Sequence, residues 1–401
     1  MLGEALRSPL GSEHREELMR RVASRGERVA FVQSVEVLVA PDLLQELLLR
    51  TAAARRQAVR TASRYQLLGL AEHLIARARG EVFEDVARAA ELGSLALEVS
   101  EGLSPQVYGG REVATVQARA WSALGNALRV RSELREADRA LSSSRELLER
   151  GHGAATDRAD YLSLLGSLRM SQARYEEARR VLEEAAGLYG QQGEAESQAK
   201  VLIKLGKALE EAGAPNEAVP LLERAEQILR EDGTELFLYA RQVRATCLNE
   251  SGRAGEAREL LEALRPEWMA RFSSFSHHQR LRWLDARISR GEGDLAAAER
   301  KFLVVQAGFE EREEAYDYAL VSLEIAALYL EQGRTAEVRE LAERMLPIFQ
   351  SQDIHRHAMA ALVLVQRAVA SDTVTVTLLH EVGQYLRRAR SNPELVYSPA
   401  S

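Results

Sequence analysis

The sequence repeats a pattern of helix, short turn and helix with a period near 40 residues. A glycine or alanine recurs in the first helix of each unit, at intervals of 41, 40, 39, 41 and 40 residues. These six positions are Gly125, Gly166, Gly206, Ala245, Ala286 and Ala326. A second small residue follows each one in the next helix, at Ala137, Ala178, Ala218, Ala257, Ala298 and Val338. Small residues let paired helices approach closely, and larger apolar residues fill the space around the contact.

A single helical pair cannot bury its own apolar face, so successive pairs must stack. The composition agrees with this architecture, because 46% of the residues are hydrophobic and the chain holds only nine prolines. Such a chain has enough apolar surface for burial and few residues that break helices. We therefore predict an all-α fold of stacked antiparallel helix pairs.

The repeat resembles the tetratricopeptide repeat family, whose frame is W-x2-L-G-x2-Y followed by A-x3-F-x2-A. The best match is carried by Trp121, Leu124, Gly125, Leu128, Ala137, Leu141 and Ser144. The period is longer than the family's usual value of about 34 residues. Extended repeats of this kind look like those in sensor domains of bacterial transcription activators and in kinesin light chains. The resemblance covers residues 61–350 and implies a right-handed α-solenoid, a TPR-like superhelix.

Two units depart from the frame. Arg241 and Arg244 stand at apolar positions of the fourth unit, and Arg282 and Asp285 stand at apolar positions of the fifth.

The two ends of the chain are expected to cap the array. We predict an N-terminal helical segment over residues 1–60, with Ser12 as an N-cap and Pro41 at a helix start. The array then spans residues 61–350 in about seven pairs. In the first of these pairs, Ile75 takes the position of the small residue in the first helix, and Ala87 takes the position of the alanine in the second helix. Capping helices follow over residues 351–392, and residues 393–401 are predicted to be a disordered tail. The arginines of the first segment are expected to form a solvated face. The alternative is that this segment is a helix-turn-helix that reads DNA.

Composition and motifs exclude several classes of protein. The net charge of −7 argues against a nucleic-acid binder, and the lone Cys247 excludes an intramolecular disulfide and a cysteine zinc cluster. The first residues lack a signal-peptide core, and no apolar run approaches the roughly 20 residues that span a bilayer. A cytoplasmic protein without membrane segments is therefore expected.

No catalytic motif is present. Gly206 and Lys207 are followed by Ala208, which is not a phosphate-binding loop, and no G-x-S-x-G or H-E-x-x-H occurs. The close histidine pairs, His277/His278 and His355/His357, diverge on a helix. We predict no metal, no cofactor and no enzymatic activity.

The chain holds four lysines, and three of them, Lys200, Lys204 and Lys207, lie on one side of a single helix. The family resemblance implies that the first helices of successive pairs line a concave groove. Carried onto this sequence, the groove positions that bear cations, amides or an aromatic ring are Arg119, Asn126, Arg129, Lys200, Lys207, Gln242, Asn249, Arg280, Trp283 and Arg287. Such groups can grip the backbone or the carboxylates of an extended peptide. The alternative is a solvated surface, as for most lysines on helices.

These features predict a non-catalytic scaffold or adaptor that binds a protein or peptide, with acidic or C-terminal carboxylate groups on the partner. One alternative is a sensor or regulatory component of a bacterial signalling or transcription-control system. Another is an enzyme or small-molecule site hidden in the groove.

Overall fold

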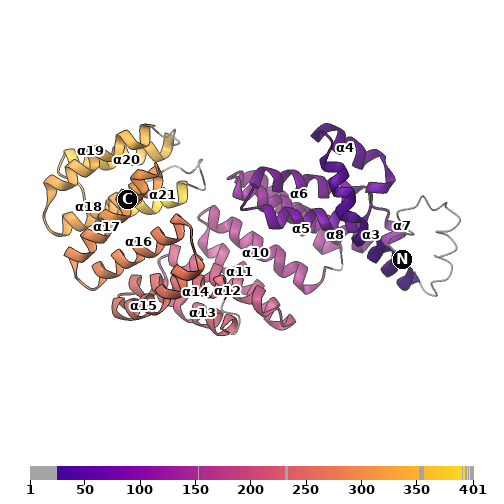
Figure 1. Cartoon of the computed structure of the whole chain (residues 1–401), viewed down its shortest axis with the longest axis horizontal. Helices are drawn as coiled ribbons and strands as arrows, with labels where there is room; N and C mark the ends of the chain where they lie inside the picture. The colour runs from indigo at the N-terminus through magenta and orange to yellow at the C-terminus, as the bar shows by residue number, and fades with distance from the viewer. Residues whose placement is uncertain are drawn as a thin grey trace. The chain divides into compact units, whose positions relative to one another are not determined.

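The computed structural model describes residues 25–151, 153–230, 234–351, 356–390, 392, 395 and 397. Every regular element among them is a helix, so the predicted fold class, a TPR-like α-solenoid of stacked pairs, is confirmed (Figure 1). The chain divides into two compact units, residues 1–168 and residues 169–401. The predicted helix capped by Ser12 lies outside the described residues, as does most of the predicted tail. The domain boundaries at residues 60, 350 and 392 stay a prediction.

The helices carry the labels of Figure 1. In the first unit they are α3 (Arg25–Leu48), α4 (Ala52–Thr61), α5 (Leu68–Glu81), α6 (Val86–Glu101), the short α7 (Pro105–Tyr108), α8 (Gly110–Val130) and α9 (Leu134–Arg150), with a single 3₁₀ turn at Ser63–Tyr65. Helix α10 (Ala155–Ser171) spans the boundary. The second unit continues with α11 (Tyr175–Gln192), α12 (Ala195–Glu211), α13 (Pro215–Leu229), α14 (Glu235–Glu250), α15 (Ala254–Arg271), α16 (Phe275–Gly291), α17 (Leu295–Glu311), α18 (Ala315–Glu331), α19 (Thr335–Ser351), α20 (Arg356–Ala370) and α21 (Val376–Ala389).

The repeat frame explains how the helices pair. All six small residues of the first helices are buried, and so are their six partners in the second helices. A Cβ atom built on Gly206 would lie 2.9 Å from the Leu222 side chain, and one built on Gly125 would lie 3.1 Å from Leu141. Helices α8 and α9, α12 and α13, α14 and α15, α16 and α17, and α18 and α19 pack as pairs. The close contacts predicted from the spacing are therefore present in these five pairs.

The turn within a pair ends the first helix sharply. After α12, Gly213 has φ +79°, and the Ala214 N–H donates to the Leu209 carbonyl at 2.8 Å. After α14, Gly252 has φ +76°, and the Arg253 N–H donates to the Leu248 carbonyl at 2.9 Å. Glycine adopts this left-handed conformation without a steric cost, and the bond satisfies a carbonyl that the helix end leaves free.

Ion pairs account for two of the four charged residues that depart from the frame, Asp285 and Arg244. Asp285 is 9% exposed, yet its carboxylate accepts bonds from Lys301 at 2.6 Å and from Arg265 at 2.7 Å. Arg244 pairs with Glu226 at 2.6 Å and with Glu223 at 3.0 Å. These residues occupy helix–helix contacts without leaving a buried charge unpaired.

Two expectations at the N-terminal end are wrong. Pro41 lies inside α3, which begins at Arg25 instead of at the proline. Ala87 is exposed because it sits in the first turn of α6, before that helix meets α5. Ala89 and Ala90 are buried in its place, at 0% and 5% exposure.

The C-terminal helices close the core of the second unit. The predicted closing pair is present as α20 and α21, and residues 373–377 form no strand, since α21 begins at Val376. Helix α21 packs against α18 as well as α20, and its Leu379, Val382 and Leu386 are at most 1% exposed. This packing places α21 beside α18, the first helix of a preceding pair.

Candidate functional site

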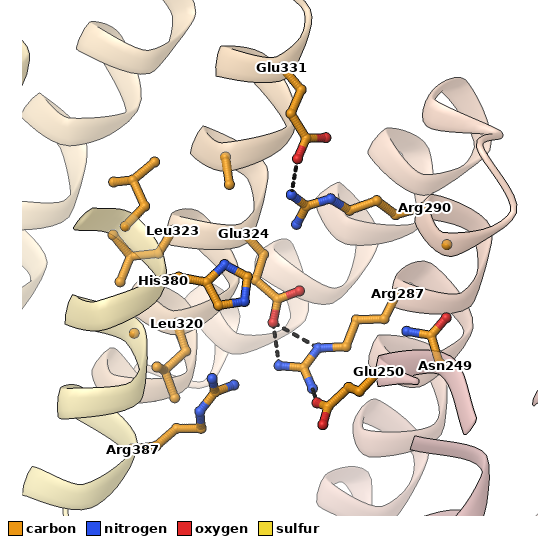
Figure 2. A pocket seen from close by; sticks show the side chains of 14 residues that line it. Asn249, Glu250, Arg287, Arg290, Leu320, Leu323, Glu324, Glu331, His380 and Arg387 are labelled. Carbon is orange, nitrogen blue, oxygen red and sulfur yellow. Dashed lines mark hydrogen bonds and ion pairs between the residues drawn. The ribbon is translucent and has the colours of Figure 1, made fainter. Parts of the chain in front are cut away.

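Three adjoining cavities of the second unit form one groove between α12, α14, α16, α18 and α21. The first has a volume of about 360 Å³ and lies between α14, α16, α18 and α21 (Figure 2). The second, of about 310 Å³, extends to α12 and shares Arg287, Leu320 and Arg387 with the first. The third, of about 350 Å³, opens beside Glu210 and Glu211 and shares Glu250, His380 and Arg387 with the first. We call this continuous space the groove.

The repeat frame sets which side chains face the groove. In α16, Ala286 is fully buried against the paired helix, and the next residue points about 100° away around the helix axis. That residue is Arg287, which lines the first two cavities. In α12 the same relationship buries Gly206 and turns Lys207 toward the second cavity.

Arg287 connects three helices across the groove. Its Nε donates to Glu324 Oε1 at 2.8 Å, and Nη2 contacts the same oxygen. The Glu250 carboxylate lies 3.9 Å away on the opposite side. Figure 2 shows these side chains from α14, α16 and α18 converging in the cavity. Although burial opposes ionisation, Arg287 holds the pKa of Glu324 below its usual value.

Trp283 is both a core residue and a groove residue. Its indole Nε1 donates to Glu324 Oε1 at 3.1 Å, and its ring meets Phe309 edge-on at 5.8 Å between centroids. The Arg287 guanidinium lies 5.2 Å from the ring centroid, in cation–π range. The same indole also lines the second cavity.

Carboxylates crowd the end of the groove near α12. Lys207 Nζ lies 2.8 Å from Glu210 Oε2, and Glu211 lines the cavity beside them. Glu250 lies in the same cavity, where burial and the Glu210 carboxylate raise its pKa to about 7. Glu250 therefore holds its proton to a higher pH than an exposed glutamate does.

Amide side chains line the groove on α14. Gln242 is 7% exposed, and its Nε2 donates to Thr246 Oγ1 at 3.2 Å. Asn249 lines the first cavity, and its buried Oδ1 has no hydrogen-bond partner among the described residues. A buried acceptor without a partner costs free energy, which makes this amide a strained point of the groove wall.

The groove gathers six of the ten residues selected from the sequence. They are Lys207, Gln242, Asn249, Arg280, Trp283 and Arg287. The Arg280 guanidinium also lies 5.9 Å from the Tyr239 ring centroid. Lys200, by contrast, is exposed and pairs with Glu196 at 2.5 Å, outside the three cavities.

The other three selected residues belong to the first unit. Arg119 pairs with Glu72 and Asp157, each at 2.6 Å, and these carboxylates raise its pKa even though burial opposes its charge. Asn126 accepts two bonds from Arg129, at 3.1 and 3.0 Å, and burial lowers the pKa of Arg129.

Sequence reasoning missed the walls formed by α18 and α21. The frame, extended to the sixth unit, marks Leu320, Leu323 and Ala327 as groove positions, and all three line the first cavity. No such signal exists for α21, because its sequence does not follow the repeat. His380 and Arg387 come from this helix.

Among the described residues, none of the helices combines the length and apolar character needed to cross a bilayer. Within the same part of the chain, no group of three or more His, Cys, Asp or Glu side chains is placed to hold a metal ion.

Residues 157–231 match the tetratricopeptide repeat family. These residues contain tetratricopeptide repeats. This repeat match spans the boundary between the two units and includes α11, α12 and α13. No curated protein matches this sequence.

Solved structures of similar fold cover most of this chain. A Rap protein complexed with competence and sporulation factor has a TM-score of 0.58 at 12% identity, over 80% of this chain and 87% of its own. The apo quorum sensor NprR from B. thuringiensis has a TM-score of 0.54 at 12% identity, over 74% and 81%. Aspartyl phosphate phosphatase F from Bacillus subtilis has a TM-score of 0.54 at 12% identity, over 78% and 75%. At this identity the likeness concerns the fold alone.

Proposed function

We propose that this tetratricopeptide repeat protein is a regulatory component of a signalling system and that it binds an extended peptide in the groove. Binding, and not catalysis, is the proposed activity. A partner protein would supply such a peptide as a terminal or unstructured segment.

One observation carries the proposal: hydrogen-bonding groups from four successive first helices converge on a single groove. Lys207 comes from α12, Gln242 and Asn249 from α14, Arg287 from α16 and Glu324 from α18. An extended peptide presents alternating N–H and C=O groups along its length, and amide side chains can pair with both. Gln242 and Asn249 supply two such amides on the α14 wall of the groove.

The charges of the groove also favour binding over chemistry. Lys207 is paired with Glu210, and Arg287 with Glu324, so these groups are already stabilised in their charged forms. A catalytic acid or base instead needs access to the reacting atoms. Paired charges can still orient a ligand, because a groove with low solvent access strengthens electrostatic contacts.

The regulatory part of the proposal is supported by the proteins of similar fold. One is described as a quorum sensor and another as complexed with competence and sporulation factor. A plain scaffold is the other reading of the same groove. The two differ in whether the helices outside the groove respond when it is filled.

Selection from a library of short random peptides with free termini tests the binding function. Isothermal titration calorimetry then compares the enriched peptides on the unmodified chain and on the Asn249→Ala and Gln242→Ala variants. Loss of one amide contact is expected to weaken binding about tenfold, equivalent to about 1.4 kcal/mol. Gln191→Ala is the matched control, because Gln191 is an exposed amide on α11 outside the groove. Equal affinity for all four proteins would contradict the proposal.

Hydrogen exchange with and without a selected peptide separates the sensor from the scaffold. A scaffold gains protection only along α12, α14, α16, α18 and α21. A sensor also changes protection in the second helices of the pairs, such as α13, α15 and α17. Protection confined to the groove would leave the regulatory reading unsupported.

A further inference from the structure

Helix α21 contributes one whole side of the groove, although it stands outside the repeat frame. Its residues Leu379, His380 and Gly383 line the first cavity, and Gln384 lines the third. Arg387 lines all three cavities. Its guanidinium can therefore meet a molecule in any of the three cavities.

The packing of α21 fixes the position of Arg387. Leu379, Val382 and Leu386 belong to the core of the second unit. The Tyr385 hydroxyl donates to the Leu395 carbonyl at 3.0 Å, and Arg390 pairs with Asp317 of α18 at 2.7 Å. Helix α21 is thus a wall of the groove, held by buried side chains on one face and by an ion pair near its end.

Arg387 differs from the three cations of the groove that are held in ion pairs. Lys207 pairs with Glu210, Arg287 with Glu324, and Arg290 with Glu331. Arg387 makes no hydrogen bond or ion pair with the part of the chain that the structure describes, and its side chain is half-buried. Figure 2 shows it extending from α21 into the cavity beside Leu320.

We propose that Arg387 anchors a carboxylate of the bound peptide, with an apolar peptide residue beside that carboxylate against Leu320 and Leu323. A guanidinium offers two parallel N–H donors that match the two oxygens of a carboxylate. Leu320 and Leu323, 5% and 2% exposed, line the first cavity next to the anchor. The carboxylate is either the peptide's C-terminus or an Asp or Glu side chain. This inference rests on the proposed peptide-binding function and adds the chemistry of its ligand.

The peptides enriched on the unmodified chain are the probe for this anchor. Their affinities are compared by calorimetry on the unmodified chain, Arg387→Gln and Arg387→Lys. Arg387→Gln is expected to weaken binding at least tenfold, because a charge-assisted pair is lost. Arg387→Lys keeps the charge without the paired donors, so its affinity should lie between those of the unmodified chain and Arg387→Gln. Arg388→Gln is the matched control, since Arg388 lies outside the three cavities and its Nε donates to the Gln384 carbonyl at 3.1 Å.

A second arm identifies the source of the carboxylate. The same peptides are resynthesised with an amidated C-terminus, and separately with Asn or Gln in place of Asp or Glu. One of these two changes should lower the affinity for the unmodified chain but not for Arg387→Gln. That change identifies the carboxylate that Arg387 binds. Thermal unfolding of Arg387→Gln should match that of the unmodified chain, which separates lost binding from lost structure.

The outcomes distinguish this inference from the proposed function. If no peptide is enriched, both are overturned. If peptides bind in the groove with equal affinity to the unmodified chain and Arg387→Gln, the peptide function stands and the anchor is overturned. The anchor is also overturned if the amidated, acid-free peptides bind as tightly as the originals.

Discussion

Lys301 Nζ lies 2.6 Å from Asp285 Oδ1, joining α17 to α16 at a position where the repeat frame expects an apolar residue. Arg258 and Arg265 of α15 reach the same carboxylate. Although burial opposes ionisation, the hydrogen bonds from these three cations lower the pKa of Asp285 to about 2. One carboxylate therefore ties three successive helices together.

This cluster predicts an acid-sensitive contribution to stability. Because the pKa of Asp285 is lower in the folded chain than in the unfolded chain, its stabilising effect is complete above about pH 4 and disappears as the pH falls toward 2. Asp285→Asn should lower the free energy of unfolding by on the order of 2 kcal/mol at pH 7. Urea unfolding from pH 7 to 3 measures the difference, which should shrink as the solution becomes acidic. Glu340→Gln, on the exposed face of α19, should show no such trend.

Glu250 predicts the opposite dependence on pH. Burial and the Glu210 carboxylate raise its pKa to about 7, so the folded chain holds a proton that the unfolded chain releases at lower pH. Stability should therefore fall as the pH rises from about 4.3 to about 7. Glu250→Gln should gain thermal stability relative to the unmodified chain across this range. A carbon NMR titration of the glutamate carboxyls checks the assignment, and a Glu250 signal that titrates near 4 would refute it.

Glu324 is expected to influence the pKa of Glu250, because both carboxylates lie near Arg287. Glu324→Gln removes the main partner of Arg287 and leaves that guanidinium for Glu250, which is 3.9 Å away. The pKa of Glu250 should then fall below its value in the unmodified chain, as the same NMR titration would show. The cost in stability should be about 1–3 kcal/mol, since a half-buried charge loses its bond. Glu331→Gln, which breaks the neighbouring pair with Arg290, should leave the titration of Glu250 almost unchanged.

Two glycines of α5 predict opposite effects of the same substitution. A Cβ atom on Gly69 would lie 2.7 Å from the backbone carbon of Glu36 in α3, so Gly69→Ala should force the two helices apart and cost about 1–3 kcal/mol. A Cβ atom on Gly80 would meet nothing within 4 Å, so Gly80→Ala should stabilise the helix by up to about 1 kcal/mol. Urea unfolding of both variants measures the difference. Equal midpoints would show that α3 does not pack closely on α5.

The sequence predicted the helix pairs well because their contacts are local and periodic. Six frames begin between Gly125 and Ala326 at intervals of 39 to 41 residues, and each frame buries the residue that it marks as small. Expectations failed where that period ends. Ala87 is exposed because the start of α6 is not set by the later frames, and Pro41 lies inside a helix whose packing outweighs the cost of one proline.

The candidate site was predictable only in part, for the same reason. Gln242 and Arg287 face the groove because the repeat frame fixes the direction of their side chains. Whether a cation is free or paired depends on residues one repeat away, such as Glu324, and spacing cannot show this. Arg387 could not be found from the repeat, because α21 reaches the groove by packing on α18 and not by following the frame.

Cys247 is the only sulfhydryl of the chain, and it lies fully buried on α14, one residue after Thr246 of the groove wall. Burial, together with the Glu210 and Glu250 carboxylates, raises the pKa of this thiol well above its usual value. A thiol reagent therefore reacts with the native protein only when α14 exposes the sulfur. The rate of alkylation thus measures how often this helix opens, with no label added to the chain.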